Sequence, residues 1–352
     1  MRLPPLKQLD EDQRWMREAL ELAAKGQGRT SPNPCVGAII VSNGQCLGKG
    51  YHKKAGGPHA EVEAVRAAIG NGFEKWLKGA TIYVTLEPCS TYGKTPPCSE
   101  LILKHGFARV VVGAKDPNPS HAGRAFRIFR NKGLEVKTGV MRQEAEDLNR
   151  AFNHWIITGR PWVVAKLAMS LDGKLTRPPR QGQWITGEKA RWDVQKERAL
   201  CDAILVGAET VRKDNPKLTL RNTKGVDLSI NRQPWRVIVT KSGRLPKKAH
   251  VFTDAFKEKT IIYKNRKWSE ALDDLGAKQV TRLMVEGGGK VVNHLAKLNG
   301  INEVILYYAP LVFDKKESRG LVHADKLRDL QLSNTQLMRL GDDLKLTGIV
   351  KS

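Results

Sequence analysis

The sequence lacks any long hydrophobic run. None of its 352 residues lies in a segment that approaches the ~18 apolar residues needed to span a bilayer. The first ten residues also lack the apolar core of a secretory signal. We therefore expect a cytoplasmic protein with no membrane partner. No repeat of fixed period is present, which excludes a solenoid.

Cysteine is scarce as well. The five cysteines are too few and too scattered for a disulfide framework, and in a reducing compartment such residues bind metal, react or fill core. Cys35 and Cys46 lie in β-type runs, where we expect them to fill core. The roles of the remaining three, Cys89, Cys98 and Cys201, have to be inferred from the residues around them.

Acidic residues are in the minority. The chain has 36 of them against 60 basic residues, a formal net charge of +24. The excess is spread over both halves without a basic run, whereas specific nucleic-acid binders concentrate charge on one element. We therefore expect phosphorylated small molecules as partners and no specific nucleic acid, with nucleic-acid binding as the alternative.

Apolar spacing predicts two α/β domains in series, over residues 1–150 and 151–352. A break at residues 158–161 (TGRP) separates two alternations of helices and strands. In the first half, Asn43-Gly44 is typical of a hairpin turn. Helices are predicted at 11–26, 59–70, 98–105, 141–158, 187–199 and 290–297. Strands are predicted at 35–41, 45–51, 80–86, 109–113, 134–138, 162–168, 203–206, 235–239, 281–285 and 303–308.

One constellation in the first half predicts a catalytic zinc site. His59 opens a predicted helix, Cys89 follows a predicted strand, and Cys98 begins the next helix. One imidazole and two thiolates make three ligands, which leaves the fourth corner of the tetrahedron to a water. Glu61 is then the carboxylate that moves protons during deamination. The alternative is a capping histidine beside two core thiols.

A glycine run in the second half gives a weaker signal. Glu286 follows an apolar strand and is succeeded by Gly287, Gly288 and Gly289 before a predicted helix. Such glycines let backbone N–H groups approach a phosphate at the positive end of a helix. The spacing is not that of a standard dinucleotide-binding fingerprint, so the pattern alone indicates a nucleotide site only weakly.

The motifs of the first half resemble the deaminase domain of the bifunctional riboflavin-biosynthesis deaminase/reductase. They are residues 31–37 (SPNPCVG), 59–61 (HAE), 87–89 (EPC), 93–98 (GKTPPC) and 116–119 (DPNP). Eight residues separate the two cysteine ligands, as in that family, whereas most nucleoside and nucleic-acid deaminases have two there. The resemblance implies a cytidine-deaminase-like three-layer domain. It also implies that Asn33, Lys94, Asp116 and Asn118 bind the substrate.

The second half resembles the reductase domain of the same enzyme. The matching segments are residues 164–173, 184–187, 202–211 and 285–289. The resemblance implies a dihydrofolate-reductase-like α/β domain that uses NADPH. Residues implied to contact NADPH are Ala168, Trp184, Thr210, Asp214, Gly287, Gly288 and Gly289. Residues implied to surround the ribose phosphate are Lys166, Thr186, Arg198, Leu218, Arg221 and Glu286.

Together the motifs predict a two-step enzyme of riboflavin biosynthesis. Zinc-dependent removal of the 2-amino group of a diaminopyrimidine ribosyl 5′-phosphate is followed by NADPH-dependent reduction of the ribosyl chain to ribityl. One alternative is a nucleic-acid deaminase with an appended basic domain. Another is a chain in which one domain has decayed to a binding or scaffold module. The sequence leaves the oligomeric state open, a homo-oligomer included.

Overall fold

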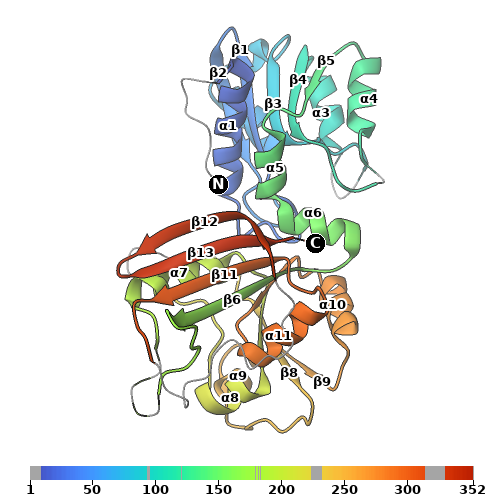
Figure 1. Cartoon of the computed structure of the whole chain (residues 1–352). Helices are drawn as coiled ribbons and strands as arrows, with labels where there is room; N and C mark the ends of the chain where they lie inside the picture. The colour runs from blue at the N-terminus through green and yellow to red at the C-terminus, as the bar shows by residue number, and fades with distance from the viewer. Residues whose placement is uncertain are drawn as a thin grey trace. The chain divides into compact units, whose positions relative to one another are not determined.

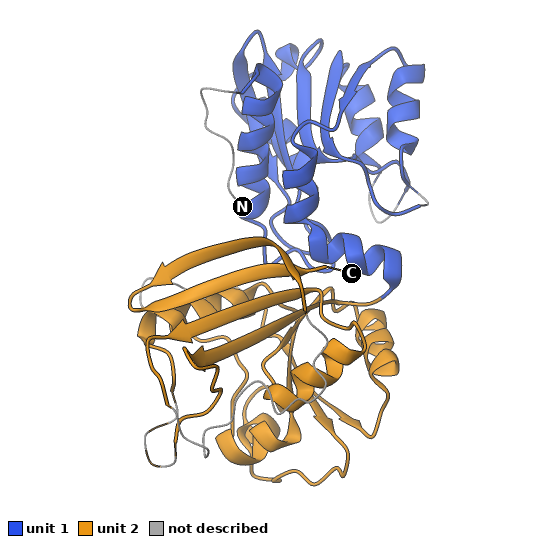
Figure 2. Ribbon diagram, in the orientation of Figure 1, with its two compact units in different colours: residues 1–159 blue, residues 160–352 orange. Residues whose placement is uncertain are grey.

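In the computed structural model the chain forms two compact units, residues 1–159 and 160–352 (Figure 2). The structure describes residues 9–351 except 93–95, 120, 179, 181, 183, 223–231 and 314–329. Within these residues, no helix has both the length and the apolar character needed to cross a membrane.

A five-stranded sheet forms the centre of the first unit, in the order β2-β1-β3-β4-β5. The strands β3, β4 and β5 are parallel, and β1 is antiparallel to both β2 and β3. The predicted hairpin between β1 and β2 is confirmed, because Asn43 and Gly44 both adopt positive φ. The strands are β1 (Gly37–Ser42), β2 (Gln45–Tyr51), β3 (Thr81–Leu86), β4 (Arg109–Ala114) and β5 (Glu135–Thr138).

Helices cover both faces of this sheet and make three layers (Figure 1). On one face α1 (Glu11–Ala24) and α5 (Arg142–Leu148) pack against Ile39 and Val111. On the other, the helices α2 (Ala60–Gly70), α3 (Cys98–Lys104) and α4 (Arg124–Asn131) pack against Ile40 and Val112. The alternation of buried side chains along β1 and β4 divides the core between the two faces.

The prediction of one helix over residues 141–158 is wrong. Two helices occupy that stretch, α5 and α6 (Arg150–Thr158), and they meet at Asn149. The buried Asn149 side chain donates to the Cys35 carbonyl at 2.9 Å and accepts from the Cys35 N–H at 2.7 Å. These long-range bonds fix Asn149 where the helix axis changes direction, and nothing in the local spacing indicates them.

The second unit is built on an eight-stranded sheet, in the order β12-β13-β11-β6-β10-β7-β8-β9. The run from β11 to β9 is parallel, and β13 is antiparallel to β11 and β12. The strands are β6 (Trp162–Ser170), β7 (Ala203–Gly207), β8 (Trp235–Thr240), β9 (Thr260–Lys264), β10 (Arg282–Val285), β11 (Glu303–Ala309), β12 (Leu332–Leu340) and β13 (Asp343–Val350).

Both faces of the second sheet are again covered. The helix α7 (Glu188–Ala199) packs on one face against Val164 and Ile305. On the other face α10 (Trp268–Ala277) and α11 (Gly289–Lys297) enclose the largest buried cluster, around Leu283 and Leu205. Two shorter helices are α8 (Ala208–Asp214) and α9 (His250–Thr253). The carboxyl ends of β6, β7 and β10 lie at one edge of this sheet, where α/β folds bind ligands.

Candidate active sites

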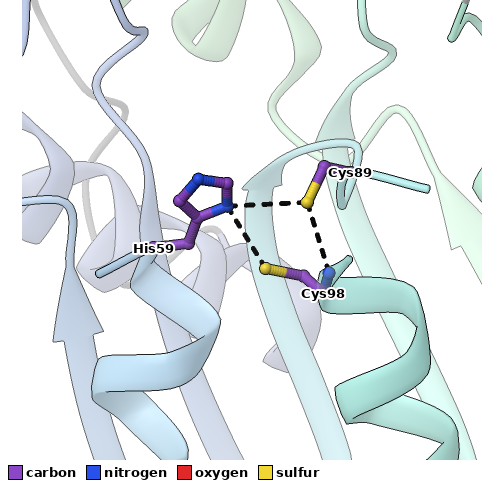
Figure 3. Close-up of side chains that lie close together, drawn as sticks. All are labelled: His59, Cys89 and Cys98. Atoms are coloured by element: carbon purple, nitrogen blue, oxygen red, sulfur yellow. Dashed lines mark hydrogen bonds between the residues drawn. The ribbon is translucent and has the colours of Figure 1, made fainter. Parts of the chain in front are cut away.

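The three predicted metal ligands come together in the first unit (Figure 3). His59 is the residue before α2, Cys89 follows β3, and Cys98 is the first residue of α3. The His59 Nδ1 atom lies 3.5 Å from the Cys89 sulfur and 3.3 Å from the Cys98 sulfur. All three ligand atoms lie within 4.8 Å of one another. This convergence brings an imidazole and two thiols to one point.

The chemistry of these donors fits zinc. The Cys98 thiol, and after it the His59 ring, hydrogen-bond to Cys89 and hold the pKa of the Cys89 thiol well below its usual range. The backbone N–H of Cys98 also donates to the Cys89 sulfur, at 3.2 Å. Because the thiolate is the form of cysteine that binds metal, the lowered pKa favours Cys89 as a metal ligand. One histidine and two cysteines are the donor set of a catalytic zinc site with an open position.

Glu61 lies in the first turn of α2, two residues beyond His59, and its side chain is buried. Burial, together with the charge on Cys89, raises the pKa of Glu61 to about 6. A carboxyl group in this range both holds and releases a proton near neutral pH, as a general acid and base must.

A cavity of about 250 Å³ surrounds His59, Glu61 and Cys89. The predicted substrate residues Asn33, Asp116 and Asn118 line it. Lys94, predicted for the same site, lies outside the described residues. Lining residues that the sequence analysis did not assign to the site include His52, Glu87, His121 and Phe152.

His52 orients the predicted substrate residue Asn33. The ring is buried, and burial lowers the pKa of His52, which keeps the imidazole neutral. Its Nδ1 atom lies 2.9 Å from the Pro58 carbonyl, so Nδ1 carries the hydrogen. The bare Nε2 then accepts from the Asn33 amide at 3.2 Å. This contact joins residues that are not neighbours in the sequence. The one indication of it in the sequence is that His52 directly follows the predicted strand 45–51.

Glu87 holds the loop that carries Asp116. Its buried carboxylate accepts from the N–H groups of Asp116 at 3.2 Å, Gly123 at 2.8 Å and Ala125 at 3.1 Å. The Asp116 carboxylate in turn accepts from the Asn118 N–H at 2.9 Å. Glu87 therefore fixes the loop that places Asp116 and Asn118 in the cavity.

In the second unit, four of the predicted substrate residues form one charged cluster. Arg198 donates through two nitrogens to the Glu286 carboxylate, at 2.6 and 2.9 Å. Burial opposes ionisation of Glu286, but the charges of Arg198 and Lys166 prevail and lower the pKa of Glu286 to about 2. Arg221 adds a further cation beside them. The cluster has three cations and one carboxylate, an excess of positive charge that suits a phosphate.

Three side chains position the backbone of residues 219–221 beside this cluster. Arg198 donates to the Thr219 carbonyl at 3.2 Å, and the Gln195 side chain accepts from the Arg221 N–H at 3.1 Å. Gln233 bonds both the N–H and the carbonyl of Leu220. The sequence analysis did not single out either glutamine, because a buried amide carries no motif.

The predicted cofactor glycines follow β10, and the last of them, Gly289, is the first residue of α11. A Cβ atom on Gly287 would approach the Cβ of Val291 to 2.8 Å, and one on Gly207, at the end of β7, would lie 3.0 Å from the same side chain. Gly288 faces open space. Close packing of these two turns, with open space at the start of α11, fits the backbone approach that a nucleotide phosphate requires.

The remaining predicted residues are placed as follows. Ala168 is partly buried on β6, Thr186 is buried just before α7, and Leu218 is buried with φ of 53°. Thr210 and Asp214 lie on α8, and Trp184 is 57% exposed. In the part of the chain that the structure describes, no hydrogen bond or ion pair joins Trp184, Thr210 or Asp214 to the charged cluster.

Family models match both units. Residues 9–114 match the cytidine and deoxycytidylate deaminase zinc-binding region, and residues 161–346 match the RibD C-terminal domain. These matches confirm the predicted fold class of each half.

Similar proteins span nearly the whole chain. Riboflavin biosynthesis protein RibD of Bacillus amyloliquefaciens is 39% identical over 365 residues, which cover 96% of each chain. The Escherichia coli (strain K12) protein of the same name is 37% identical over 96% of this chain and 98% of its own.

Solved structures agree. Acinetobacter baumannii RibD superimposes with a TM-score of 0.88 at 36% identity, over 97% of this chain and 99% of the other. A Thermotoga maritima diaminohydroxyphosphoribosylaminopyrimidine deaminase/5-amino-6-(5-phosphoribosylamino)uracil reductase gives 0.84 at 34% identity, with the same coverage. The chain therefore belongs to the RibD family of riboflavin-biosynthesis enzymes, which combine a zinc-dependent deaminase with an NADPH-dependent reductase.

Proposed function

We propose that residues 1–159 deaminate a diaminopyrimidine ribosyl 5′-phosphate and that residues 160–352 reduce its ribosyl chain to ribityl. The Thermotoga maritima relative is named as a deaminase and a reductase of such phosphoribosylamino compounds. The observation that carries the proposal is the convergence of His59, Cys89 and Cys98 beside the buried Glu61.

In the first unit His59, Cys89 and Cys98 hold zinc, which when bound supplies Lewis-acid activation of the attacking water. The Glu61 carboxylate would take one proton from that water and give it to the ring nitrogen, and would then carry the second proton, from the newly added hydroxyl, to the leaving amine. A pKa of about 6 for Glu61 suits both directions of transfer. Asn33, Asp116 and Asn118 line the same cavity and orient the pyrimidine. Lys94 lies outside the described residues, and its role as a phosphate ligand is proposed from the resemblance alone.

In the second unit NADPH, when bound, supplies the hydride for the ring-opened ribosyl aldehyde, and the chain supplies orientation. The turn of Gly287, Gly288 and Gly289 accepts the cofactor at the start of α11, and Ala168, Trp184, Thr210 and Asp214 complete its surroundings. Lys166 and Arg221 bind the substrate phosphate. Thr186 and Leu218 shape the space around it.

Arg198 has a different role in this proposal. Its guanidinium is hydrogen-bonded to Glu286 and to the Thr219 carbonyl. Arg198 therefore positions the residues of the phosphate site and does not itself bind the phosphate. The alternative of a nucleic-acid deaminase with a basic domain is not favoured, because the match to the RibD C-terminal domain covers residues 161–346.

Glu61→Gln tests the deaminase assignment. The variant should retain about one zinc per chain, because Glu61 is not a ligand. It should lose deamination by about a hundredfold or more, because an amide cannot accept a proton. Metal analysis and single-turnover deamination measure the two properties.

The matched control is Glu63→Gln, on the same helix but outside the cavity and paired with Lys53 and Arg66. It should deaminate at the normal rate. Equal activity of the two variants would refute the role of Glu61, and zinc-free protein with full activity would refute the metal site.

A further inference from the structure

A second cavity lies in the first unit, at the carboxyl ends of the parallel strands β4 and β5. Its volume is about 430 Å³. Among the described residues, none that lines it also lines the cavity of the metal ligands. Its lining residues come from β4, the loop after β4, α4, the end of β5 and the start of α5. They are Gly113, Lys115, Gly123, Phe126, Arg130, Thr138, Gly139 and Arg142.

The charge of this basic cleft is entirely positive. Lys115, Arg130 and Arg142 line it from three different elements, and no carboxylate does so. Arg142 is paired with Glu146 at 2.6 Å. Within the described ranges, no carboxylate forms an ion pair with Lys115 or Arg130. Neither of these two cations is therefore neutralised by an ion pair in the part of the chain that the structure describes.

Two glycines with positive φ keep the cleft open. Gly139, with φ of 81°, makes the turn after β5, and a Cβ atom there would meet nothing within 4 Å. At Gly123, with φ of 78°, a Cβ atom would lie 3.5 Å from the Lys115 ammonium nitrogen, so the lysine side chain rests over this glycine. Larger residues would fill the hollow that the three cations surround.

Backbone amides at the start of α4 are not available to a ligand in this cleft. The N–H groups of Gly123 and Ala125 both donate to the Glu87 carboxylate. Recognition must therefore come from the side chains. An arginine fork and a lysine ammonium are the groups that pair with phosphate oxygens, and the hydroxyl of Thr138 adds a donor.

We propose that the basic cleft is a binding site for the phosphate group of a small phosphorylated molecule, separate from both active sites. Crevices at the carboxyl ends of parallel strands are where α/β folds bind ligands. The backbone of a nucleic acid offers the same phosphates, but it would need a basic track that continues past the cleft along α4. Arg127 is exposed on α4 and does not line the cleft. A substitution of Arg127 therefore distinguishes binding of a small phosphorylated molecule from binding of a nucleic acid.

The test compares Arg130→Gln and Lys115→Gln with Arg127→Gln in the full-length, zinc-loaded protein. Each variant loses one positive charge, so the change in overall charge is the same. Inorganic phosphate is the probe, and its binding is followed by the line width of its phosphorus NMR signal. Binding that all three variants share belongs to the two active sites. Circular dichroism and unchanged deamination by Arg130→Gln and Arg127→Gln verify that the fold is intact.

Loss of one exposed charge-assisted contact should weaken phosphate binding about threefold to tenfold in Arg130→Gln and Lys115→Gln. Arg127→Gln should bind like the unaltered protein. If Arg127→Gln weakens binding as much as the others, or if none does, the proposal is wrong. In a parallel arm with a single-stranded oligonucleotide, weakening by all three variants without any change in phosphate binding would assign the surface to nucleic acid and overturn it.

Discussion

Arg198 and Arg221 belong to one charged cluster but have different surroundings. Arg198 is buried and bonded through two nitrogens to Glu286. Arg221 is exposed, and among the described residues only its backbone N–H is hydrogen-bonded. Arg221→Ala should therefore lower kcat/KM for the phosphorylated substrate by roughly tenfold or more, through the loss of one charge-assisted contact. Steady-state reduction at saturating NADPH measures this effect.

Arg198→Met should act on stability instead. It leaves the Glu286 carboxylate buried without its main partner, which typically costs about 3–5 kcal/mol. Urea unfolding of Arg198→Met and of the double variant with Glu286→Gln checks this, since the double variant should recover much of the loss. Normal stability of Arg198→Met, with impaired use of phosphorylated substrate, would place Arg198 on the substrate.

Asp12 gives the first unit a pH-dependent stability. Hydrogen bonds from Arg109 foremost, with Lys137 and Tyr83, overcome burial and hold the pKa of Asp12 far below its usual range. The folded state therefore keeps Asp12 ionised, while the unfolded chain takes up a proton near pH ~4. The stabilisation is complete at neutral pH and is lost as the pH falls below about 5.

Asp12→Asn should thus lower the free energy of unfolding at neutral pH by about 1–3 kcal/mol, and by less in acid. Urea unfolding between pH ~3 and ~7 measures the difference from the unaltered protein. Glu21→Gln, an exposed change on the same helix, is the control. A difference between Asp12→Asn and the unaltered protein that does not shrink in acid would contradict the account.

At the residue scale, the sequence indicated the candidate metal ligands and proton-transfer residue better than the residues that hold them in place. His59, Glu61, Cys89 and Cys98 were found because three chemical types occur in order, each next to an element terminus. Their supports were missed. His52 and Glu87 act through contacts with residues elsewhere in the chain. In the second unit, Gln195 and Gln233 act through hydrogen bonds between their side-chain amides and the backbone of residues 220 and 221. Such contacts have no period or spacing that could reveal them.

Helices and strands were predictable from the sequence where one of their faces is buried. The core strands of both sheets lie close to their predicted ranges because their apolar residues face helices. Strands β9, β12 and β13 were not predicted. Nearly all of β12 is exposed at a sheet edge, and its sequence carries no alternation. The junction of α5 and α6 was missed because the bonds of Asn149 to Cys35 decide it.

The turn into α11 can be tested as an element. Gly288 has φ of −64° and faces open space, so a larger side chain fits the backbone and projects where the cofactor is placed. Gly288→Ile should weaken NADPH binding by about tenfold or more while the protein stays folded, because it blocks the anion from the helix start. Fluorescence titration measures it.

Arg221→Ala is the reciprocal control for Gly288→Ile, and its affinity for NADPH should stay unchanged. The opposite pattern, with cofactor lost in Arg221→Ala and retained in Gly288→Ile, would show that the two ligands are assigned the wrong way round.

At the scale of the whole molecule, we expect the two activities to separate at Gly159. Phe152 lines the deaminase cavity and therefore belongs with the first unit, although it lies beyond the predicted boundary near residue 150. A fragment of residues 1–159 should bind zinc and deaminate without NADPH. A fragment that ends at residue 150 lacks Phe152 and should be impaired.

Deamination by each purified fragment, with zinc content and circular dichroism as controls, measures this separation. A folded, zinc-loaded 1–159 fragment without deaminase activity would show that the second unit completes the first site.

The central claim is that one chain performs a zinc-dependent deamination and an NADPH-dependent reduction at separate sites. Its most direct test is mass analysis of the products that the full-length protein forms from the diaminopyrimidine ribosyl 5′-phosphate, with and without NADPH. Without NADPH the product should have exchanged its amino group for oxygen, and with NADPH it should also have gained two hydrogens. Cys98→Ser should still reduce an already deaminated substrate. Unchanged substrate in the presence of zinc and NADPH, or loss of that reduction in a folded Cys98→Ser protein, would contradict the claim.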